Sequence, residues 1–458
     1  MKIEKKYKEE RPFEKEDKIP EVLVLSRKRV MPVNKSGITP RNLLKIKPIR
    51  IIVKSKYYPI VPQLINLSVF VVLIIGSIGV GYNPKIAPYI ANTNLANQIV
   101  WNIWWPFTLV FAAIAGHLWC SICPLELVNS LGSRIGLKKK APGFLRSGWV
   151  VTLFFAFILF GAGKYLGLQA VPRTMAIYLI TVISLSFILG LIFEKRSFCS
   201  YVCPLGSIIG MYSYIAGTQW RADDPAVCKE CKTKDCVAKR NRYKLTGHSC
   251  TSNINPARIP DNRECLLCTH CLKVCPSANF KFSLCLPFTD FFKNIKLTLA
   301  EMGMLMLIIG FVNNNWHALV VFTLIPLVLC LLVSWRTLKP MLNAFMVLLI
   351  PTTAVAHMLH AFRGMIWNWP VFKLNLLDPL GVRTANMLAE KIMIIDRNGL
   401  GPAWRLFGTT TGLLYGAVFA VSVAIILKSP LTENINRTGK LLLILSVASY
   451  IASFYIKV

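Results

Sequence analysis

The sequence predicts an all-α polytopic membrane protein with about nine transmembrane helices and a small cysteine-rich insert of mixed α and β structure. Three observations support this fold class. The 458 residues are 54% hydrophobic and only 16% charged, with a mean hydropathy of +0.51, whereas ordinary soluble domains carry about 25% charged residues. Apolar stretches near the length of a bilayer span recur along the chain. Most of the 14 cysteines lie in a few short segments, which argues against a scaffold of evenly spread disulfides.

The charge balance is strongly basic, with 53 Lys and Arg against 21 Asp and Glu and a formal net charge of +32. In a soluble protein this excess would indicate a nucleic-acid partner. In a membrane protein, however, Lys and Arg accumulate in the loops that stay in the cytoplasm, and cysteine-bound metal clusters would cancel part of the charge. We therefore expect contact with membrane lipid and no nucleic-acid partner.

The first predicted region, residues 1–58, is a basic cytoplasmic arm. It holds 17 Lys and Arg against 7 Asp and Glu, and five prolines are spread through it. Its beginning has no apolar stretch with a small-residue cleavage site, so it does not follow the pattern of a secretory signal. The composition predicts a partly disordered segment that lies along anionic lipid.

Nine apolar stretches follow in two groups. We expect spans at 60–80, 101–118, 149–168 and 175–193, and then at 298–313, 317–335, 341–362, 405–427 and 440–457. Each approaches the length needed to cross a bilayer, although 298–313 is short and contains Glu301. The stretches divide the chain into a four-helix membrane domain at 59–218, a polar domain at 219–296 and a C-terminal membrane domain of about five helices at 297–458.

Basic residues also predict the orientation of these spans. The N-terminal arm, the loop around Lys139 and the loop at 428–440 fall on one side when nine spans are counted, and we expect this side to be the cytoplasm. The segment 363–404 is also basic, yet it would lie outside. The same count brings every cysteine except Cys330 to the cytoplasmic face. The predicted location is the inner, cytoplasmic membrane, with the polar domain in the cytoplasm.

The most specific motif is the run Cys265-Leu-Leu-Cys268-Thr-His-Cys271-Leu-Lys-Val-Cys275-Pro276. Its spacing, C-x2-C-x2-C-x3-C-P, is that of bacterial ferredoxins, in which three close thiolates bind one [4Fe–4S] cluster and the fourth cysteine binds the neighbouring cluster. Paired CxxC hooks can also bind zinc. Three cysteines at this spacing, followed by Cys-Pro, favour iron and sulfide, and they make the polar domain a small α+β ferredoxin-like domain with two clusters.

A second, less regular run lies upstream, where three cysteines have the spacing C-x2-C-x4-C and a fourth follows at a distance. Ligation across the two runs, as in two-cluster ferredoxins, assigns the cysteines to two sites. One site takes Cys228, Cys231, Cys236 and Cys275, and the other takes Cys250, Cys265, Cys268 and Cys271. Cys285 is the alternative to Cys250 in this scheme. Nearby lysines would stabilise the reduced clusters and attract an acidic redox protein.

A third group of cysteines lies where two predicted spans leave the membrane. The two segments are Cys120-Ser-Ile-Cys123-Pro-Leu and Cys199-Ser-Tyr-Val-Cys203-Pro-Leu. The repeat of Cys-Pro-Leu at equivalent helix ends argues against the simple packing of four thiols as small apolar groups. Two interpretations stay open. The four thiols bind a third cluster, or they act as redox-active thiols near the lipid interface.

Cys-Pro motifs at two helix ends, followed by a two-cluster ferredoxin insert, resemble the NapH/NosR/CcoG-type membrane polyferredoxins. The similarity covers roughly residues 60–287 and rests on CSICPLE, CSYVCPLG and the cysteine runs of the insert. It implies a membrane-bound 4Fe-4S protein associated with quinol dehydrogenation, with maturation of nitrous-oxide reductase or with copper handling in oxidase assembly. The chain departs from the family pattern in its first motif, which has two residues between the cysteines where the family usually has three.

The expected function is membrane iron–sulfur electron transfer between the quinone pool, or another membrane donor, and a redox partner subunit. The expected cofactors are two [4Fe–4S] clusters, with a third as the open alternative, and quinone is the candidate substrate. The chain would then be a component of a quinol-dehydrogenase-type oxidoreductase. The alternative is a redox assembly or regulatory protein that supplies electrons for the maturation of a metalloenzyme. No catalytic residue is assigned.

Two histidines are further candidates because polar groups at membrane depth are often functional. His357 and His360 share one helix face and could line a quinone pocket. Hydrogen bonds to neighbouring residues are the simpler interpretation. The sequence shows no convincing pair of facing histidines, so haem is not expected.

Aromatic and acidic side chains near the span ends have plainer interpretations. Trp101, Trp104 and Trp105 indicate an aromatic belt at the membrane interface. Glu126 and Glu194, which lie beside the two Cys-Pro motifs, are expected to pair with basic side chains.

Overall fold

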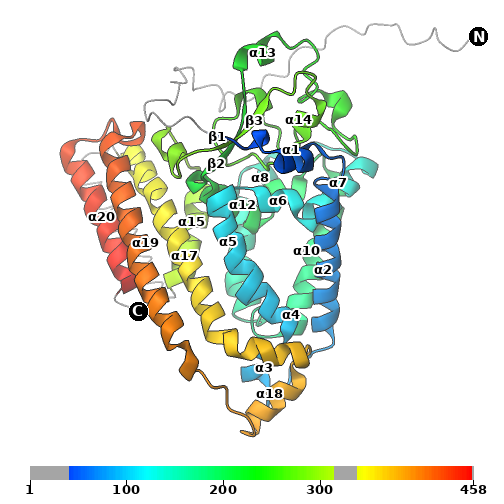
Figure 1. The fold of residues 1–458 in the computed structure, drawn as a ribbon, viewed down its shortest axis with the longest axis vertical. Coiled ribbons are helices and arrows are strands. Elements are labelled where there is room, and N and C mark those ends of the chain that lie inside the picture. The colour runs from blue at the N-terminus through cyan, green and yellow to red at the C-terminus, as the bar shows by residue number, and fades with distance from the viewer. Residues whose placement is uncertain (1–40, 314–337, 456–458) are drawn as a thin grey trace, which may run out of the picture. The chain divides into compact units, whose positions relative to one another are not determined.

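The computed structural model describes residues 41–313 and 338–455. The first 40 residues of the predicted arm, and the predicted span at 317–335 with its Cys330, lie outside the described residues. The described chain is mostly helical. Its long helices run alongside one another, and a small sheet with its loops lies at one end of them (Figure 1).

Six described helical stretches are long and apolar enough to cross a membrane. They are α2 (Ile60–Ile78), the continuous stretch of α4 (Leu95–Gln98), η3 (Ile99–Trp104) and α5 (Trp105–Ala115), α10 (Pro172–Ile192), α17 (Leu338–Leu377), α19 (Gly401–Lys428) and α20 (Arg437–Tyr455). The predicted spans at 149–168 and 298–313 correspond to shorter apolar helices, namely α9 (Trp149–Ala156) with η4 (Phe157–Gly163), and α15 (Leu299–Asn313). The predicted number of nine spans is therefore not confirmed.

Helix α17 differs most from its prediction, which placed a span at 341–362 and an outer segment at 363–404. The helix instead continues to Leu377, through Pro351 and Pro370. Nearly every side chain of its first half is buried, because α17 packs against α5, α15, α19 and α20. Burial on several sides stabilises the helix enough to offset the hydrogen bonds that the prolines remove. Helix α18 (Val382–Ala389) follows and packs on α3 (Ala87–Thr93).

Two similar segments form the part of the bundle next to the insert. In the first, α5 is followed by α6 (Leu118–Ile122) and α7 (Pro124–Ile135). In the second, α10 is followed by α11 (Ser197–Tyr201) and α12 (Pro204–Tyr212). Helix α7 packs along α10, and α12 packs against α5, so the two repeats are interleaved. Gly132 permits the close approach of α7 to α10, because a Cβ atom there would lie 2.7 Å from the backbone oxygen of Phe187.

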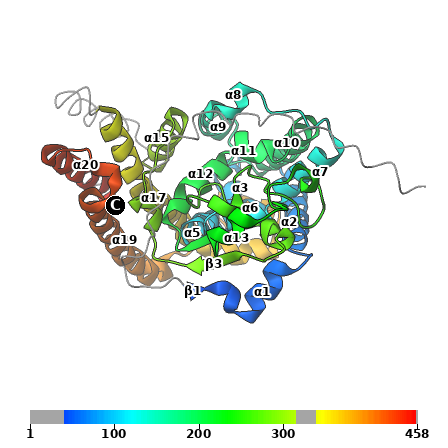
Figure 2. The same cartoon turned by 90° about the horizontal axis from the view of Figure 1, so that it is seen from above.

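The insert is built on a three-stranded antiparallel sheet in the order β1-β3-β2. Strand β2 (Thr218–Ala222) precedes the cysteine loops, and β3 (Phe280–Leu284) follows them. Strand β1 (Arg41–Asn42) belongs to the predicted N-terminal arm and pairs with the other edge of β3. Figure 2 shows β1 and β3 beside one another, with α1 (Lys47–Lys54) next to β1. The end of the predicted arm thus folds onto the insert.

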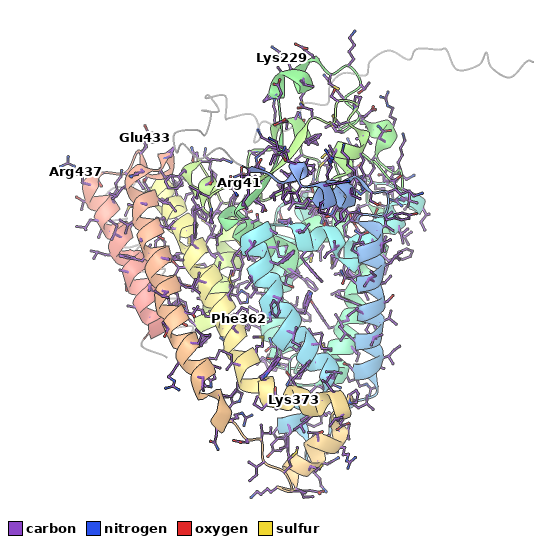
Figure 3. The ribbon with its side chains drawn as sticks, viewed as in Figure 1. Arg41, Lys229, Phe362, Lys373, Glu433 and Arg437 are labelled. Atoms are coloured by element: carbon purple, nitrogen blue, oxygen red, sulfur yellow. The ribbon has the colours of Figure 1, made fainter. Side chains whose placement is uncertain are left out.

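Two short helices carry cysteines in the loops of the insert. They are α13 (Pro225–Glu230) and α14 (His270–Val274). Lys229, on α13, lies at the tip of the insert, whereas Lys373, near the end of α17, lies at the opposite end of the helices (Figure 3). The cysteines therefore gather at one end of the bundle.

Candidate functional site

The second cysteines of the two membrane-edge motifs have the same local geometry. Cys123 and Cys203 each have an extended backbone (φ −70°, ψ 133° and φ −71°, ψ 111°), and helices α7 and α12 begin at the proline that follows. Proline suits the first helical position because its missing N–H would have no partner there. Each thiol therefore lies at the N-terminus of a helix, where backbone N–H groups and the helix dipole favour negative charge.

These helix starts act on the two thiols in matching ways. Burial and the nearby Cys203 thiol raise the pKa of Cys123 to about 12, whereas the first backbone N–H groups of α7 act to lower it. Burial likewise raises the pKa of Cys203, and the first N–H groups of α12 oppose that effect. The repeat in the sequence is thus also a repeat in electrostatic surroundings.

The structure brings together the four thiols that we call the membrane-edge set, namely Cys120, Cys123, Cys199 and Cys203. Cys120 and Cys199 are each affected electrostatically by the other motif and by their own. Burial raises the pKa of all four thiols, so free thiols would be neutral here. A cationic metal centre would hold them as thiolates. The donor set therefore fits a cluster bound by four thiolates.

Within the insert, one small pocket is lined by the four cysteines that we call the inner set, namely Cys250, Cys265, Cys268 and Cys271. Leu267 and Thr269 of this loop are left-handed, with φ of 58° and 61°. This conformation is unusual for leucine, and alternating backbone hands turn successive N–H groups toward a common anion-binding concavity. Burial raises the pKa of Cys265 to about 11 and that of Cys268 to about 12.

The remaining ferredoxin-run cysteines form the outer set, namely Cys228, Cys231, Cys236 and Cys275. Burial raises the pKa of Cys236 to about 11, and the other three thiols of the outer set add to the effect. Cys285 lies apart, since its thiol is affected by Asp290 and not by either set. Cys250 therefore lies beside the ferredoxin run and Cys275 beside the upstream run. The assignment of the two sets to two clusters stays a prediction.

In residues 41–313 and 338–455, no three His, Cys, Asp or Glu side chains are arranged to hold one metal ion.

One side-chain N–H group donates to a cysteine sulfur in each set of the insert. Trp220 Nε1 donates to Cys271 Sγ at 3.3 Å, and Asn279 Nδ2 donates to Cys228 Sγ at 3.3 Å. Hydrogen bonds to the sulfurs of a cluster tune its reduction potential. The sequence did not single out either residue, because a tryptophan or asparagine near a cysteine run carries no distinguishing pattern.

The two carboxylates beside the Cys-Pro motifs are paired with arginines, as the simpler interpretation predicts. Glu126 Oε1 lies 3.7 Å from Arg196 Nε, and Glu194 pairs with Arg242. Arg196 was missed from the sequence. Its position directly before the second motif was the available signal.

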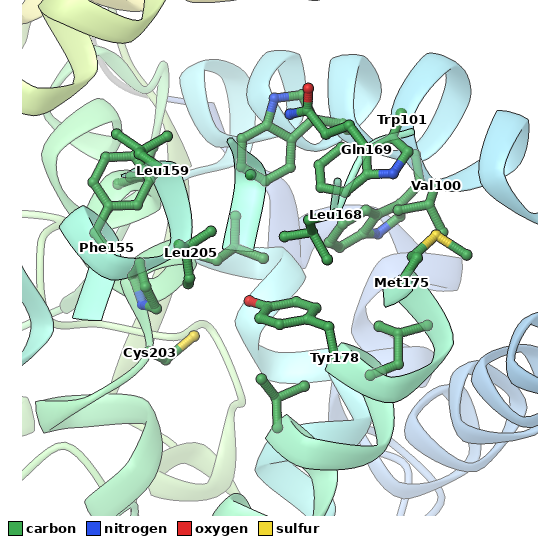
Figure 4. Close-up of a pocket in the computed structure, with 18 of the residues that line it drawn as sticks. Val100, Trp101, Phe155, Leu159, Leu168, Gln169, Met175, Tyr178, Cys203 and Leu205 are labelled. Carbon is green, nitrogen blue, oxygen red and sulfur yellow. The ribbon is translucent and has the colours of Figure 1, made fainter. Parts of the chain in front are cut away.

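A cavity of about 500 Å³ lies among α10, α12, α17 and the two π-helical segments η3 and η4. Its walls are mainly aromatic and aliphatic, and they include Cys123 and Cys203 of the membrane-edge set. Cys203 and Tyr178 both point into this space (Figure 4). π-Helical segments are rare and often occur at functional sites, and here both of them line the same cavity.

His357 lines this cavity and is fully buried. Trp105 Nε1 donates to its Nε2 at 3.3 Å, and its Nδ1 lies 3.0 Å from the Tyr212 hydroxyl. Because Nε2 accepts, the neutral ring carries its proton on Nδ1 and donates it to Tyr212. The predicted hydrogen bonds to neighbouring residues are confirmed for His357, and His360 lines the same cavity.

The predicted interfacial belt is wrong for the tryptophans at the start of the second span. Trp101, Trp104 and Trp105 line the cavity, and their rings contact one another at centroid distances of 6.1 to 6.3 Å. A tryptophan near a span end has the same sequence pattern whether it faces lipid or a cavity between helices, so hydropathy could not separate the two.

The two membrane repeats are similar to a known family of proteins. A family model described as a 4Fe-4S binding domain matches residues 98–143 and 175–222. These segments contain both Cys-Pro motifs with the helices on either side, and the cysteine run at 265–275 lies outside them.

Curated relatives match about two fifths of the chain. Ferredoxin-type protein NapH of Haemophilus influenzae is 20% identical over 188 residues, which are 38% of this chain and 65% of NapH. Protein NirI of Paracoccus denitrificans is 26% identical over 200 residues, which are 39% of this chain and 28% of NirI. The predicted resemblance to the NapH-type membrane polyferredoxins is confirmed. An uncharacterized protein of Methanocaldococcus jannaschii is 26% identical over 183 residues, which are 38% of this chain and 68% of that protein.

No solved structure matches the chain. The similarity to the NapH-type polyferredoxins, the 4Fe-4S family match and the apolar helices together support an iron–sulfur protein of the membrane that acts in electron transport.

Proposed function

We propose that this polyferredoxin passes electrons between a quinol bound in the cavity and a redox protein that docks on the insert. The cavity is the observation that carries the proposal. It lies among candidate spans, and two cysteines of the membrane-edge set form part of its wall. A quinone ring bound there would lie beside the proposed third cluster.

The cavity suits a quinone in size and in lining. A volume of about 500 Å³ lies within the range of sites that bind small organic ligands. The indoles of Trp104 and Trp105 offer flat apolar faces, and His357 and His360 supply imidazoles. Oxidation of one quinol releases two electrons and two protons. Each cluster takes one electron at a time, and the protons pass to basic groups or water at the cavity.

The order of the thiol sets supports a path through the protein. The membrane-edge set adjoins the cavity, the inner set lies in the body of the insert, and the outer set lies beside α13 near the insert's tip. Cys275 of the outer set follows Cys271 of the inner set by four residues, about one turn of α14. This short separation keeps the two sites adjacent. We propose three [4Fe–4S] clusters at these sets.

The redox partner is proposed to be acidic. Lys229, Lys232 and Lys234 are exposed around the outer set, and a positive rim accelerates encounter with a negative partner surface. The basic loops beside the spans support a cytoplasmic location for this face, with the helices in the cytoplasmic membrane.

The test is reduction of anaerobically purified protein by a short-chain quinol, followed by EPR. Leu159→Trp would fill the cavity, which Leu159 lines. Leu153→Trp, on the same apolar helix but 64% exposed, is the matched control. We expect dithionite to reduce all three proteins and the quinol to reduce only the wild type and Leu153→Trp. Equal reduction of both variants by the quinol would place its site elsewhere. A wild type that dithionite reduces and no quinol reduces would favour the assembly or regulatory function.

A further inference from the structure

A buried bridge joins the membrane-edge set to the inner set. The Tyr58 hydroxyl lies 2.9 Å from Ser121 Oγ and 3.1 Å from the carbonyl oxygen of Leu267. Ser121 follows Cys120, and Leu267 precedes Cys268. Covalent bonds and these two hydrogen bonds therefore connect one thiol set to the other without crossing open solvent.

Arg196 is the charged member of this bridge. Arg196 is 7% exposed and lies in the turn between α10 and α11, three residues before Cys199. The guanidinium donates through Nη1 to Ser252 Oγ at 3.4 Å, and its Nε lies 3.7 Å from Glu126 Oε1. Ser252 follows Cys250 of the inner set by two residues, and Glu126 follows Cys123 of the membrane-edge set by three. One side chain thus reaches the loops of both sets.

The carboxylate facing Arg196 is itself held in place. Gln63 Nε2 donates to Glu126 Oε2 at 2.8 Å and to the carbonyl of Ser121 at 2.9 Å. Arg196 is coupled electrostatically to Glu126 and to cysteines of both sets. They are Cys120, Cys199 and Cys203 of the membrane-edge set, and Cys250 and Cys268 of the inner set. Three cysteines of the membrane-edge set and two of the inner set therefore share the field of a single buried cation.

We propose that Arg196 is the shared counter-cation of the membrane-edge and inner sites and raises the reduction potential of both clusters together. The inference rests on the iron–sulfur part of the proposed function and not on quinol. Reduction adds one electron, and hence one negative charge, to a cluster without making or breaking a bond. In surroundings of low dielectric, a nearby positive charge stabilises that added charge. No thiol of the outer set is among the leading electrostatic partners of Arg196, so the effect should be weakest there.

The experiment is an EPR-monitored redox titration of the full chain with dithionite, which needs no quinol. Signals are assigned by their loss in Cys120→Ser, Cys268→Ser and Cys228→Ser variants. We expect Arg196→Gln to shift the midpoint potentials of the membrane-edge and inner signals to more negative values and to leave the outer signal in place. Glu126→Gln removes the opposite charge from the same bridge, so it should shift the same two signals to more positive values.

Two further variants separate the proposal from general effects. Arg196→Lys keeps the charge and should restore most of the wild-type potentials. Arg383→Gln, an exposed residue of α18, removes an equal charge far from the clusters and should shift nothing. If Arg196→Gln loses iron, Glu126→Gln carries the test. The proposal is overturned if Glu126→Gln and Arg196→Gln shift the signals in the same direction, if only one signal responds, or if Arg383→Gln produces the same shift. A wild type without iron would instead overturn the proposed function.

Discussion

The insert and the membrane edge gather cysteines in two different ways. In the insert, Cys265, Cys268 and Cys271 come from one short loop whose left-handed residues turn its backbone toward the pocket. At the membrane edge, the pairs ending in Cys123 and Cys203 come from two helix starts about 80 residues apart in the chain, and the packing of α7 on α10 brings them together. The first site depends on local backbone shape, and the second depends on tertiary packing.

This difference implies that the two kinds of site can be lost independently. A change in the insert should leave the helix starts in place, because they are held by the bundle. A change between α7 and α10 should leave the ferredoxin loops in place, because they are held by the sheet and its core of Trp220 and Phe280.

The largest expected effect is the loss of whole clusters. Three [4Fe–4S] clusters correspond to about twelve irons per chain, and Cys120→Ser/Cys203→Ser should lower this to about eight. Cys268→Ser should remove the inner cluster and leave the membrane-edge cluster. Iron, zinc and acid-labile sulfide per chain measure the outcome.

About eight irons in both the wild type and Cys120→Ser/Cys203→Ser would contradict the third cluster, since the membrane-edge cysteines would then act as thiols. Zinc in place of iron would remove the redox interpretation of the insert as well. Cys285→Ser serves as the matched control, because Cys285 lies apart from all three sets, and it should retain the wild-type iron content.

The next effect concerns the stability of the insert. Asp290 is 1% exposed and accepts hydrogen bonds from the backbone N–H of Asn262 and from Lys293, while Arg221 lies 3.7 Å away. Asp290→Ala leaves these donors and charges uncompensated and should destabilise the insert by about 3–5 kcal/mol. Chemical denaturation followed through the cluster absorbance measures it. Asp223→Ala, whose side chain is 60% exposed in its ion pair with Lys281, should change the stability by less than about 1 kcal/mol.

A smaller destabilisation, in the membrane domain instead of the insert, is expected from a change in the packing of α7 on α10. A Cβ atom at Gly132 would meet the backbone oxygen of Phe187 at 2.7 Å, so Gly132→Ala should separate the helices and destabilise the membrane domain by about 1–3 kcal/mol. Iron analysis should show partial loss of the membrane-edge cluster and intact insert clusters. Gly416→Ala, on a face of α19 with nothing within 4 Å, should lose no iron. Equal iron loss from every site in Gly132→Ala would show that the two regions are not independent.

The features that could be predicted from the sequence are the local ones, and those that depend on tertiary packing could not be predicted. The proximity of Cys265, Cys268 and Cys271 could be predicted from the spacing of a ferredoxin run, whereas the sequence left Cys250 and Cys285 as alternatives for the fourth thiol. The end of α17 could not, because its continuation beyond residue 362, through Pro370, depends on the helices packed around it. The bridge could not be predicted either. Arg196 is hydrogen-bonded to a residue 56 positions away in the chain, and Tyr58 to residues 63 and 209 positions away. Such contacts leave no local pattern.

The cavity shows the same limit. Trp101, Trp104 and Trp105 were expected at a lipid interface because hydropathy cannot distinguish a lipid-facing indole from one that faces a cavity. The cavity lining combines side chains from η3, η4, α10, α12 and α17, and no single one of these segments contains enough of it to be recognised.

The smallest predicted effect tests the assignment of thiols within the insert. Trp220→Phe removes the N–H donor to Cys271 and should lower the potential of the inner cluster alone, whereas Asn279→Ala removes the donor to Cys228 and should lower that of the outer cluster alone. A hydrogen bond of about 1 kcal/mol corresponds to about 40 mV for a one-electron couple. EPR-monitored titration of both variants measures the shifts, with Phe282→Leu as the packing control, because that ring contacts Trp220 and no sulfur bond depends on it. If each variant shifted both signals equally, the inner and outer sets would not be separate sites. The insert as a whole would then be the unit that differs from the membrane edge in how its cysteines are brought together.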